Sequence, residues 1–465
     1  MEEELKEKLF RKRKQGWTDA SESEKEEIFK ISEKYMEYLN KAKTEREFIK
    51  QAKKLADENG FKDIMEFSNL KAGDKIYFIN REKSMYLAII GEKSIENGMH
   101  IIGSHVDSPR LDLKPNPLSE DTGLAYFKTH YYGGIKKYQW TTIPLSIHGV
   151  IVKTNGEKIK VSIGEEENEP IFTITDLLPH LAQEQMEKKL KNGIEGEDLK
   201  ILVGSMPYSN EKTPESVKLN ILNILNKKYG ITEDDLSSSE LEVVPAFKAR
   251  SLGLDSSMVA AYGQDDKVCA YTSLAAMMTL ENVKNTAVCI LSDKEEIGSM
   301  GNTGMESHMF DFFISEILNK LNVNRPNLLD KVFCFSKMLS SDVDAGFDPI
   351  YASVSDKQNA GLIGSGISLN KYTGSRGKSG ASDANAEYVA WVKNILEKNG
   401  IKYQVAELGK VDVGGGGTIA YILANKGVDV IDCGVPVLSM HAPYEVTSKF
   451  DIYSAYKTYQ TFWKE

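Results

Sequence analysis

The 465-residue chain contains little cysteine, and its four cysteines show no CxxC spacing. This scarcity excludes a disulfide framework and a thiolate zinc site, so we expect ordinary buried thiols. The chain also lacks a hydrophobic run long enough to span a membrane. Its first segment, MEEELKEKLFRKRKQGW, is charged throughout and has no apolar core of the kind that a signal peptide needs. We therefore expect a cytoplasmic protein that has no membrane partner.

Positive charge is also in deficit, because 58 Lys and Arg residues stand against 68 Asp and Glu residues, which gives a formal net charge of -10. This balance provides no electrostatic footprint for a polyanion, so we expect no nucleic-acid partner. The sequence has no internal repeat, and its glycine run VDVGGGGTIA lacks the GxxxxGK(S/T) pattern of a phosphate-binding loop. We interpret this run as a tight turn ahead of a helix.

The order of the expected strands and helices predicts an α/β domain with an insertion. Short apolar runs, KIYFIN, SMYLAII and MHIIGS, predict strands in residues 1–117. In residues 118–245, TTIPLSIHGVIVKT and KIKVSIG predict two strands joined by a hairpin at NGE, followed by a stretch rich in Lys and Glu. The α/β alternation returns in residues 246–465, where SMVAAYGQDDKVCAYTSLAAMMTL predicts a long helix and NTAVCILSD a strand.

Polar residues follow several of these strands at their ends, which is where open α/β sheets bind ligands. They are His105 and Asp107 after MHIIGS, Asp293, Glu295 and Glu296 after NTAVCILS, Asp342 after FSKMLSS, and His441 after GVPVLSM. Asp265 in GQDDKVCAY is a further candidate because it opens a helical segment. Taken singly, such residues are more often structural, as hydrogen-bonded histidines, helix N-caps or solvated glutamates.

The combined chemistry of these residues favours a metal site. Two imidazoles and three carboxylates suit a pair of divalent ions such as zinc, manganese or cobalt, provided that one carboxylate bridges them. The neighbouring Glu295 and Glu296 can point in different directions, so that one binds a metal and the other acts as a base on water. Asp107, two residues after His105, can orient the imidazole ring.

In these motifs the sequence resembles the aspartyl aminopeptidase and vacuolar aminopeptidase I family of dinuclear metallopeptidases. The resemblance rests on HVDSPRLDLKPNP, GQDDKVCAY, DKEEIGS, SSDVDA and SMHAPYE, which occur in the family's order between His105 and Glu445. It implies a mixed-sheet α/β zinc-peptidase catalytic domain with two divalent ions per subunit, expected to be zinc. By this resemblance one ion is held by His105 and Asp342 and the other by Glu296 and His441, with Asp265 as the bridge.

The same resemblance assigns further roles. Glu295 takes the place of the general base, and Asp107 takes that of the aspartate that orients the histidine. The insertion, residues 118–245, is implied to be a β-rich dimerisation domain, and the dimers are implied to form a homo-oligomer, a tetrahedral dodecamer. His180 in DLLPHLAQE resembles a histidine that reaches the active site of a neighbouring subunit.

Two segments depart from the family pattern. After Asp342 the chain reads VDAGFDPIY where family members have AHAVHPN, so both histidines are missing, at Ala345 and Asp348. The second segment, GSGISLNKYTGSRGKSGASDANAE, predicts a mobile loop and replaces the usual KxNxNQRYA pattern. Lys371 is the predicted substrate-binding cation in this loop, with Arg376 and Lys378 as alternatives.

We therefore predict a metalloaminopeptidase that removes an amino-terminal residue from peptides with activated water. The resemblance implies Asp or Glu as that residue, with a neutral residue such as leucine as the alternative. Two other functions stay open on the sequence alone, namely a dinuclear deacylase of N-acyl amino acids and a non-catalytic, metal-stabilised assembly protein. The adjacent Glu295 and Glu296 argue against the second, because a structural metal site needs no base beside its ligand.

Overall fold

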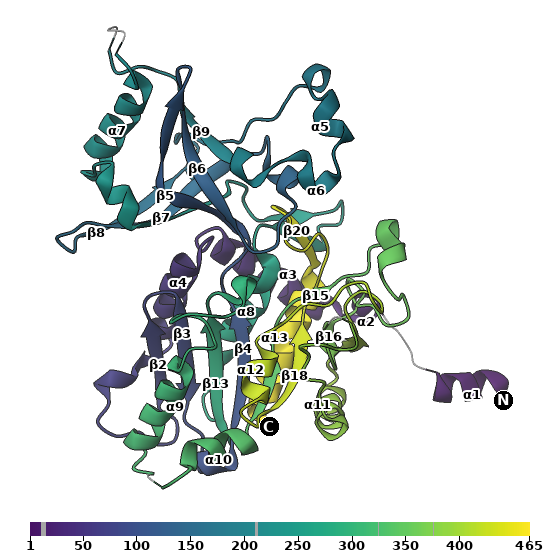
Figure 1. The fold of residues 1–465 in the computed structure, drawn as a ribbon. Coiled ribbons are helices and arrows are strands. Elements are labelled where there is room, and N and C mark those ends of the chain that lie inside the picture. Colours follow the sequence, from purple (N-terminus) through teal and green to yellow (C-terminus); the bar gives the residue numbers. More distant parts are fainter. Residues whose placement is uncertain (11–14, 210–212, 324, 375) are drawn as a thin grey trace. The chain divides into compact units, whose positions relative to one another are not determined.

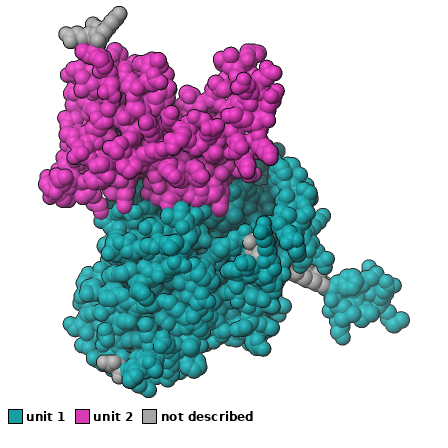
Figure 2. All heavy atoms as spheres, in the orientation of Figure 1, with its two compact units in different colours: residues 1–107, 249–440, 445–465 teal, residues 108–248, 441–444 magenta. Residues whose placement is uncertain are grey.

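The structure is a computed structural model that describes residues 1–10, 15–209, 213–323, 325–374 and 376–465 (Figure 1). The chain divides into two compact units (Figure 2). Unit 1 comprises residues 1–107, 249–440 and 445–465, and unit 2 comprises residues 108–248 and 441–444. Our sequence boundary lay after residue 117, whereas the units divide after Asp107, because β5 (Arg110–Asp121) is one strand of the unit 2 sheet. No helix among the described residues is long and apolar enough to cross a membrane.

Unit 1 is built on a nine-stranded mixed sheet with the order β1-β2-β3-β13-β4-β14-β18-β16-β17. Its strands are β1 (Lys62–Asp63), β2 (Lys75–Asn80), β3 (Ser84–Ile89), β13 (Thr286–Ser292), β4 (Met99–His105), β14 (Lys337–Ser340), β18 (Asp429–Gly434), β16 (Ile367–Asn370) and β17 (Tyr403–Ala406). Strands β13, β4, β14 and β18 are parallel neighbours, so their carboxyl ends meet at one edge of the sheet. Strands β3 and β16 pair with this group in antiparallel fashion.

Helices cover both faces of this sheet (Figure 1). One core contains residues of α3 (Glu22–Leu39), α4 (Glu45–Glu58), α8 (Gln264–Met277), α11 (Ala386–Lys398) and α13 (Lys449–Lys464). The other contains residues of α9 (Met309–Lys320), α10 (Leu328–Phe335) and α12 (Ala420–Ala424). In β4, Ile102 belongs to the first core and Ile101 to the second. This burial on both faces explains why the strand reads as an unbroken apolar run.

Smaller elements complete unit 1. A three-stranded sheet contains β11 (Arg250–Leu252), β12 (Met258–Ala261) and β20 (Glu445–Ser448), and a two-stranded one contains β15 (Asp344–Ala345) and β19 (Pro436–Val437). The short helices α1 (Glu2–Leu9) and α2 (Gly16–Asp19) precede α3. Two expectations change here. The long helix predicted from Ser257 is preceded by strand β12, and the loop predicted from Gly364 contains strand β16.

Unit 2 is an antiparallel sheet of six strands with the order β8-β7-β10-β5-β6-β9. Besides β5, its strands are β6 (Leu124–Tyr132), β7 (Leu145–Val152), β8 (Lys158–Ile163), β9 (Lys200–Gly204) and β10 (Ser239–Pro245). Its helices are α5 (Gln183–Glu187), α6 (Leu190–Gly193) and α7 (Ser216–Tyr229). The predicted hairpin joins β7 and β8 through Gly156, whose φ of 87° favours glycine.

Candidate metal centre

The ends of three neighbouring parallel strands bring the candidate residues of unit 1 together. Strand β4 ends at His105, which lies beside Ser292 at the end of β13. Glu295 and Glu296 follow β13 in a short 3-10 turn, Glu295–Ile297. On the other side of β4, strand β14 ends at Ser340, two residues before Asp342. The order of the strands therefore places residues that are far apart in the sequence at one edge of the sheet.

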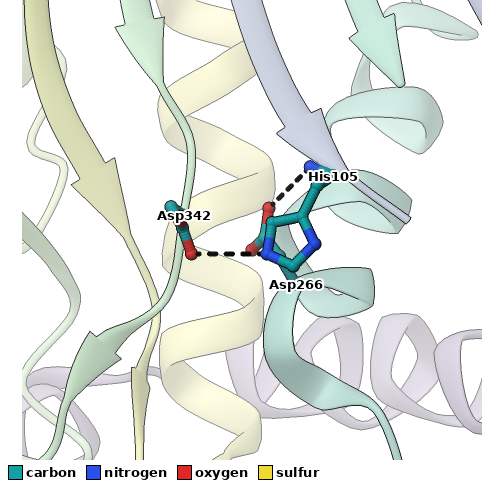
Figure 3. A group of neighbouring side chains, drawn as sticks. All are labelled: His105, Asp266 and Asp342. Atoms are coloured by element: carbon teal, nitrogen blue, oxygen red, sulfur yellow. Dashed lines mark hydrogen bonds and ion pairs between the residues drawn. The ribbon is translucent and has the colours of Figure 1, made fainter. Parts of the chain in front are cut away.

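His105 is the centre of this cluster. Its Nε2 atom lies 3.2 Å from Asp265 Oδ1, 3.7 Å from Glu295 Oε2 and 3.8 Å from Asp342 Oδ1. Figure 3 shows Asp342 facing the imidazole ring, with Asp266 beside it. His105 is 2% exposed. The ring is thus surrounded by carboxylates in an environment from which most solvent is excluded.

Asp107 fixes both the imidazole ring and the glutamate turn. Its Oδ1 atom lies 3.2 Å from His105 Nδ1, and its backbone carbonyl lies 3.0 Å from the same nitrogen. The two carboxylate oxygens also accept hydrogen bonds from the backbone N–H groups of Glu295 and Glu296, each at 3.2 Å. A single buried carboxylate therefore connects the end of β4 to the turn after β13.

Burial and like charge shift the proton equilibria of the cluster. Burial is the main cause that raises the pKa of Asp266 and of Asp342 well above the usual range of a carboxyl group, and for Asp342 the charge of Asp266 is the next cause. Burial by itself would lower the pKa of His105, but hydrogen bonds with Asp107 and Asp265 raise it well above its usual value. The cluster thus concentrates negative charge that a bound cation would neutralise.

The donor set fits divalent metal ions. Two groups of side chains have their ligand atoms within 4.8 Å of one another: His105 with Asp266 and Asp342, and His105 with Asp265 and Glu296. Each group offers an imidazole nitrogen and two carboxylate oxygens, the donor types that zinc, manganese and cobalt accept. A divalent ion at this position would neutralise the negative charge of the carboxylates that surround the imidazole of His105.

The sequence singled out Asp265 and missed its neighbour Asp266. Asp265 has non-helical backbone angles inside the first turn of α8, with φ -79° and ψ 109°. Its backbone N–H donates to Glu445 Oε2 at 3.1 Å, whereas Asp266 Oδ2 accepts from the backbone N–H of His105 at 3.2 Å. Helical periodicity does not predict this arrangement. The only signal in the sequence is the Asp-Asp pair of GQDD itself.

The remaining predicted site residues are described here within their own units. His441 belongs to unit 2, where its Nδ1 atom lies 2.8 Å from the carbonyl oxygen of Gly134. His180 also belongs to unit 2 and is exposed in a 3-10 turn, Pro179–Leu181. Lys371 belongs to unit 1, and its Nζ atom lies 3.5 Å from Asp383 Oδ1. Unit 1 alone therefore assembles four of the five predicted metal ligands together with Glu295 and Asp107.

Comparison with known proteins identifies the family of the chain. A sequence model described as "Aminopeptidase I zinc metalloprotease (M18)" matches residues 38–463. The chain belongs to the M18 family of aminopeptidases. A probable M18 family aminopeptidase 1 from Clostridium acetobutylicum is 50% identical over 458 residues, which are 98% of each chain.

Solved structures agree with this membership of the M18 family. The crystal structure of an M18 aminopeptidase from Thermotoga maritima is 45% identical and superposes with a TM-score of 0.94, covering 98% of this chain and 99% of that one. The yeast mApe1 dodecamer shares the fold at 22% identity, with a TM-score of 0.75 over 94% of this chain and 96% of that one.

Membership of the M18 family decides between the functions that the sequence left open. The chain is a metallo-aminopeptidase, a hydrolase of peptide bonds, and the family is one of metal-dependent enzymes. The predicted α/β fold and enzyme class are confirmed. The peptidase function is therefore retained, and the alternatives of a deacylase and a non-catalytic assembly protein are rejected.

Proposed function

We propose that this M18 aminopeptidase works with two divalent ions, expected to be zinc, with manganese and cobalt as alternatives. The supporting observation is that four carboxylates, those of Asp265, Asp266, Glu296 and Asp342, surround the single imidazole of His105 in two overlapping groups of possible ligands, which is more carboxylate than one ion bound by His105 requires. Asp265, Glu296 and Asp342 are the proposed partners of His105 in unit 1, and Asp265 is the proposed bridge. His441 is proposed as the fifth ligand on the family resemblance alone. Bound ions would lower the pKa of a water molecule and polarise the peptide carbonyl.

Glu295 is the proposed general base of this reaction. Its side chain is 15% exposed and its Oε2 atom lies 3.7 Å from His105 Nε2, so it is at the cluster and still reached by solvent. From this position it would take a proton from the attacking water and deliver it to the departing amine. Asp107 holds the base indirectly, because it accepts the hydrogen bond of the Glu295 backbone N–H.

The assignment of Glu295 is tested by Glu295→Gln, with Glu316→Gln in α9 as the matched control, since the Glu316 side chain is likewise mostly covered, at 23% exposed, and pairs with Lys320. We expect the first variant to lose at least about 100-fold in kcat, since general base catalysis contributes 10²–10⁴. Its metal content, measured by plasma mass spectrometry, should stay at the wild-type value, and the control should keep full activity. Wild-type kcat in Glu295→Gln would show that another group accepts the proton.

The proposed substrates are peptides with a free amino terminus, with Asp or Glu as the first residue by resemblance and a neutral residue as the alternative. Lys371 is the proposed reader of an acidic side chain. Its ion pair with Asp383 at 3.5 Å places it in a loop that also carries Lys378, 3.0 Å from the same carboxylate. Lys371 and Lys378 therefore share one carboxylate, that of Asp383. One net positive charge remains with which a substrate carboxylate could pair.

The substrate proposal is tested on matched peptides that begin with Asp, Glu, Leu or Lys, with added zinc, manganese or cobalt and with a chelator control. Cleavage that requires metal and favours Asp or Glu would support both parts of the proposal. A preference for peptides that begin with Leu would contradict the proposed acidic specificity and support the neutral alternative. Amino-terminally acetylated peptides should resist cleavage, and their hydrolysis would contradict recognition of the free amine.

We also propose that unit 2 is a dimerisation domain and that the chain assembles into a homo-oligomer, a tetrahedral dodecamer. Among the described residues of unit 2, five apolar side chains within the short segment 177–190 are at least half exposed: Leu177, Leu178, Leu181, Met186 and Leu190. Apolar patches of this kind are typical of protein interfaces. His180 lies among them, in agreement with its proposed role at the active site of another subunit. By the same expectation from the sequence, the assembly resides in the cytoplasm.

Light scattering after gel filtration tests the assembly. Twelve chains of 51.9 kDa give a particle of about 620 kDa. Leu181→Glu places a charge in the exposed apolar set of unit 2 and should reduce the particle mass. Leu254→Glu changes a fully exposed leucine of unit 1 and should leave the particle mass unchanged. A particle of one or two chains at micromolar concentration for the wild type would contradict the dodecamer.

A further inference from the structure

The loop that carries Glu295 and Glu296 is closed at its base by one buried hydrogen bond. Thr303 Oγ1 donates to Asp293 Oδ2 at 2.6 Å, and Asp293 also forms a parallel β-bridge with Gly304. Asp293 is 1% exposed and Thr303 is 2% exposed. Residues 293 and 304 are thereby held side by side, and the ten residues between them form a compact loop.

The interior of this loop contains backbone conformations that need external support. Lys294, directly before Glu295, has a φ of 67°, and Ser299 has a φ of 59°. Positive φ values are unfavourable for residues other than glycine. The backbone N–H groups of Ile297 and Ser299 both donate to the carbonyl of Lys294, at 3.3 and 2.7 Å, which tightens the turn. A loop with this geometry keeps its shape only where its ends are fixed.

Besides backbone contacts, three side chains hold the loop, and each acts on a different part of it. Asp107 accepts the N–H groups of Glu295 and Glu296 in the first turn of the loop. The side-chain amide of Asn80, at the end of β2, donates to the carbonyl of Asn302 at 2.7 Å. The Thr303 hydroxyl binds Asp293 at the base. Asp107 fixes only the start of the loop, so the return segment that ends at Thr303 depends on the other two contacts.

The burial of Asp293 makes the loss of this hydrogen bond costly. Asp293 is buried, and the carboxylates of Glu45 and Asp107 lie close enough to add to the rise in its pKa that burial causes. A buried carboxyl group that loses a hydrogen-bond donor incurs a desolvation cost, so the surrounding loop must move to compensate. Glu295 and Glu296 follow Asp293 by two and three residues, so a movement of the loop at Asp293 would displace them.

We propose that Thr303 and Asp293 are positioning residues for Glu295 and Glu296, and that their hydrogen bond sets the rate of the chemical step through the shape of the loop. Neither residue touches the substrate in this proposal, which rests on the proposed role of Glu295 as the base. A displacement of about 1 Å in a catalytic group can cost about 100-fold in rate. Loss of the bond should therefore lower kcat more than it changes KM.

The test uses Thr303→Val, which removes the donor and keeps the branched shape of the side chain. We expect kcat to fall 10- to 100-fold, with KM within threefold of the wild type and metal content unchanged. Thr303→Ser restores the hydroxyl and should recover kcat to within threefold. Thr286→Val makes the same change at the other end of β13, where the buried hydroxyl accepts from the backbone N–H of Gly91 at 3.1 Å. It should lose stability but keep its kcat.

Each outcome separates this proposal from the one on which it rests. If Glu295→Gln is inactive but Thr303→Val has a wild-type kcat, the positioning role is wrong and the base assignment stands. Equal loss of kcat in Thr303→Val and Thr286→Val, or failure of serine to rescue, would also overturn the positioning role. If Glu295→Gln is active, the base assignment itself fails. Should Thr303→Val not fold, Asn80→Ala removes the second anchor and is expected to lower kcat at unchanged metal content, and a wild-type kcat in that variant would contradict the proposal.

Discussion

Acid is expected to destabilise the protein through His100, which lies near the start of the strand that ends at His105. His100 is 4% exposed. Its Nδ1 atom lies 3.1 Å from the carbonyl oxygen of Phe462, and its Nε2 atom lies 3.0 Å from the side-chain amide of Asn285. A neutral ring with the proton on Nδ1 satisfies both contacts, because Nε2 then accepts from the amide. Burial lowers the pKa of His100 from 6.5 to about 4.

The sign and size of the effect follow from this pKa. The unfolded chain takes up a proton at His100 near pH 6.5, whereas the folded chain does so only near pH 4, so protons favour the unfolded state between these values. Stability from this group is complete above pH 6.5 and is lost as the pH falls towards 4. The two pKa values, 6.5 and about 4, differ by about 2.5, so at about 1.4 kcal/mol for each unit the full loss is about 3.5 kcal/mol. About 3 kcal/mol of this is lost by pH 4, where half of the folded molecules carry the proton.

The assay compares urea unfolding of chelated protein at pH 7 and pH 4 for the wild type and His100→Asn. The asparagine amide can donate to the Phe462 carbonyl but does not titrate, so the variant should lose about 3 kcal/mol less than the wild type over this pH interval. His308→Asn is the control, because the His308 side chain is 98% exposed, and it should follow the wild type. Equal pH dependence in the wild type and His100→Asn would refute the reasoning.

Three further predictions concern the site. Removal of the ion by a chelator should lower the melting temperature in calorimetry, since a ligand at 100 times its Kd stabilises the folded state by about 2.7 kcal/mol; an unchanged melting temperature would contradict metal binding to the folded state. Asp266→Asn should weaken metal affinity about 10- to 100-fold in competition titrations, because Asp266 holds the backbone of His105 and faces Asp342; wild-type affinity would make Asp266 a purely structural residue. Asp383→Ala should raise kcat/KM for peptides that begin with Asp relative to those that begin with Leu, because it releases Lys371; an unchanged ratio would count against Lys371 as the reader.

The sequence predicted the part of the site that depends on parallel strands. His105 and Asp342 each follow an apolar run, and side chains that follow neighbouring parallel strands must gather at one edge of the sheet. The different roles of Glu295 and Glu296 stay a prediction, which rests on adjacent residues in a turn pointing to different sides. The proximity of these residues therefore needed only the strand assignments.

The missed features have a different physical origin. Asp266 contacts β4 because the first turn of α8 departs from helical geometry, and hydrophobic periodicity carries no information on such a departure. Strand β12 was taken for the start of the helix because Met258–Ala261 is short, apolar and followed directly by α8. Strand β16 was hidden by a Gly- and Ser-rich neighbourhood, although Ile367 and Leu369 alternate with polar residues as a strand requires.

The division between the units after Asp107 has a consequence for how such a chain can change over evolutionary time. Asp107 connects His105 to the glutamate turn, and the next peptide bond already leads into unit 2. An altered or resized insertion is therefore compatible with catalysis only if its first residue leaves the Asp107 backbone in place. The first of the peptide bonds that link the units thus places a constraint on the insertion that comes from the proposed active site.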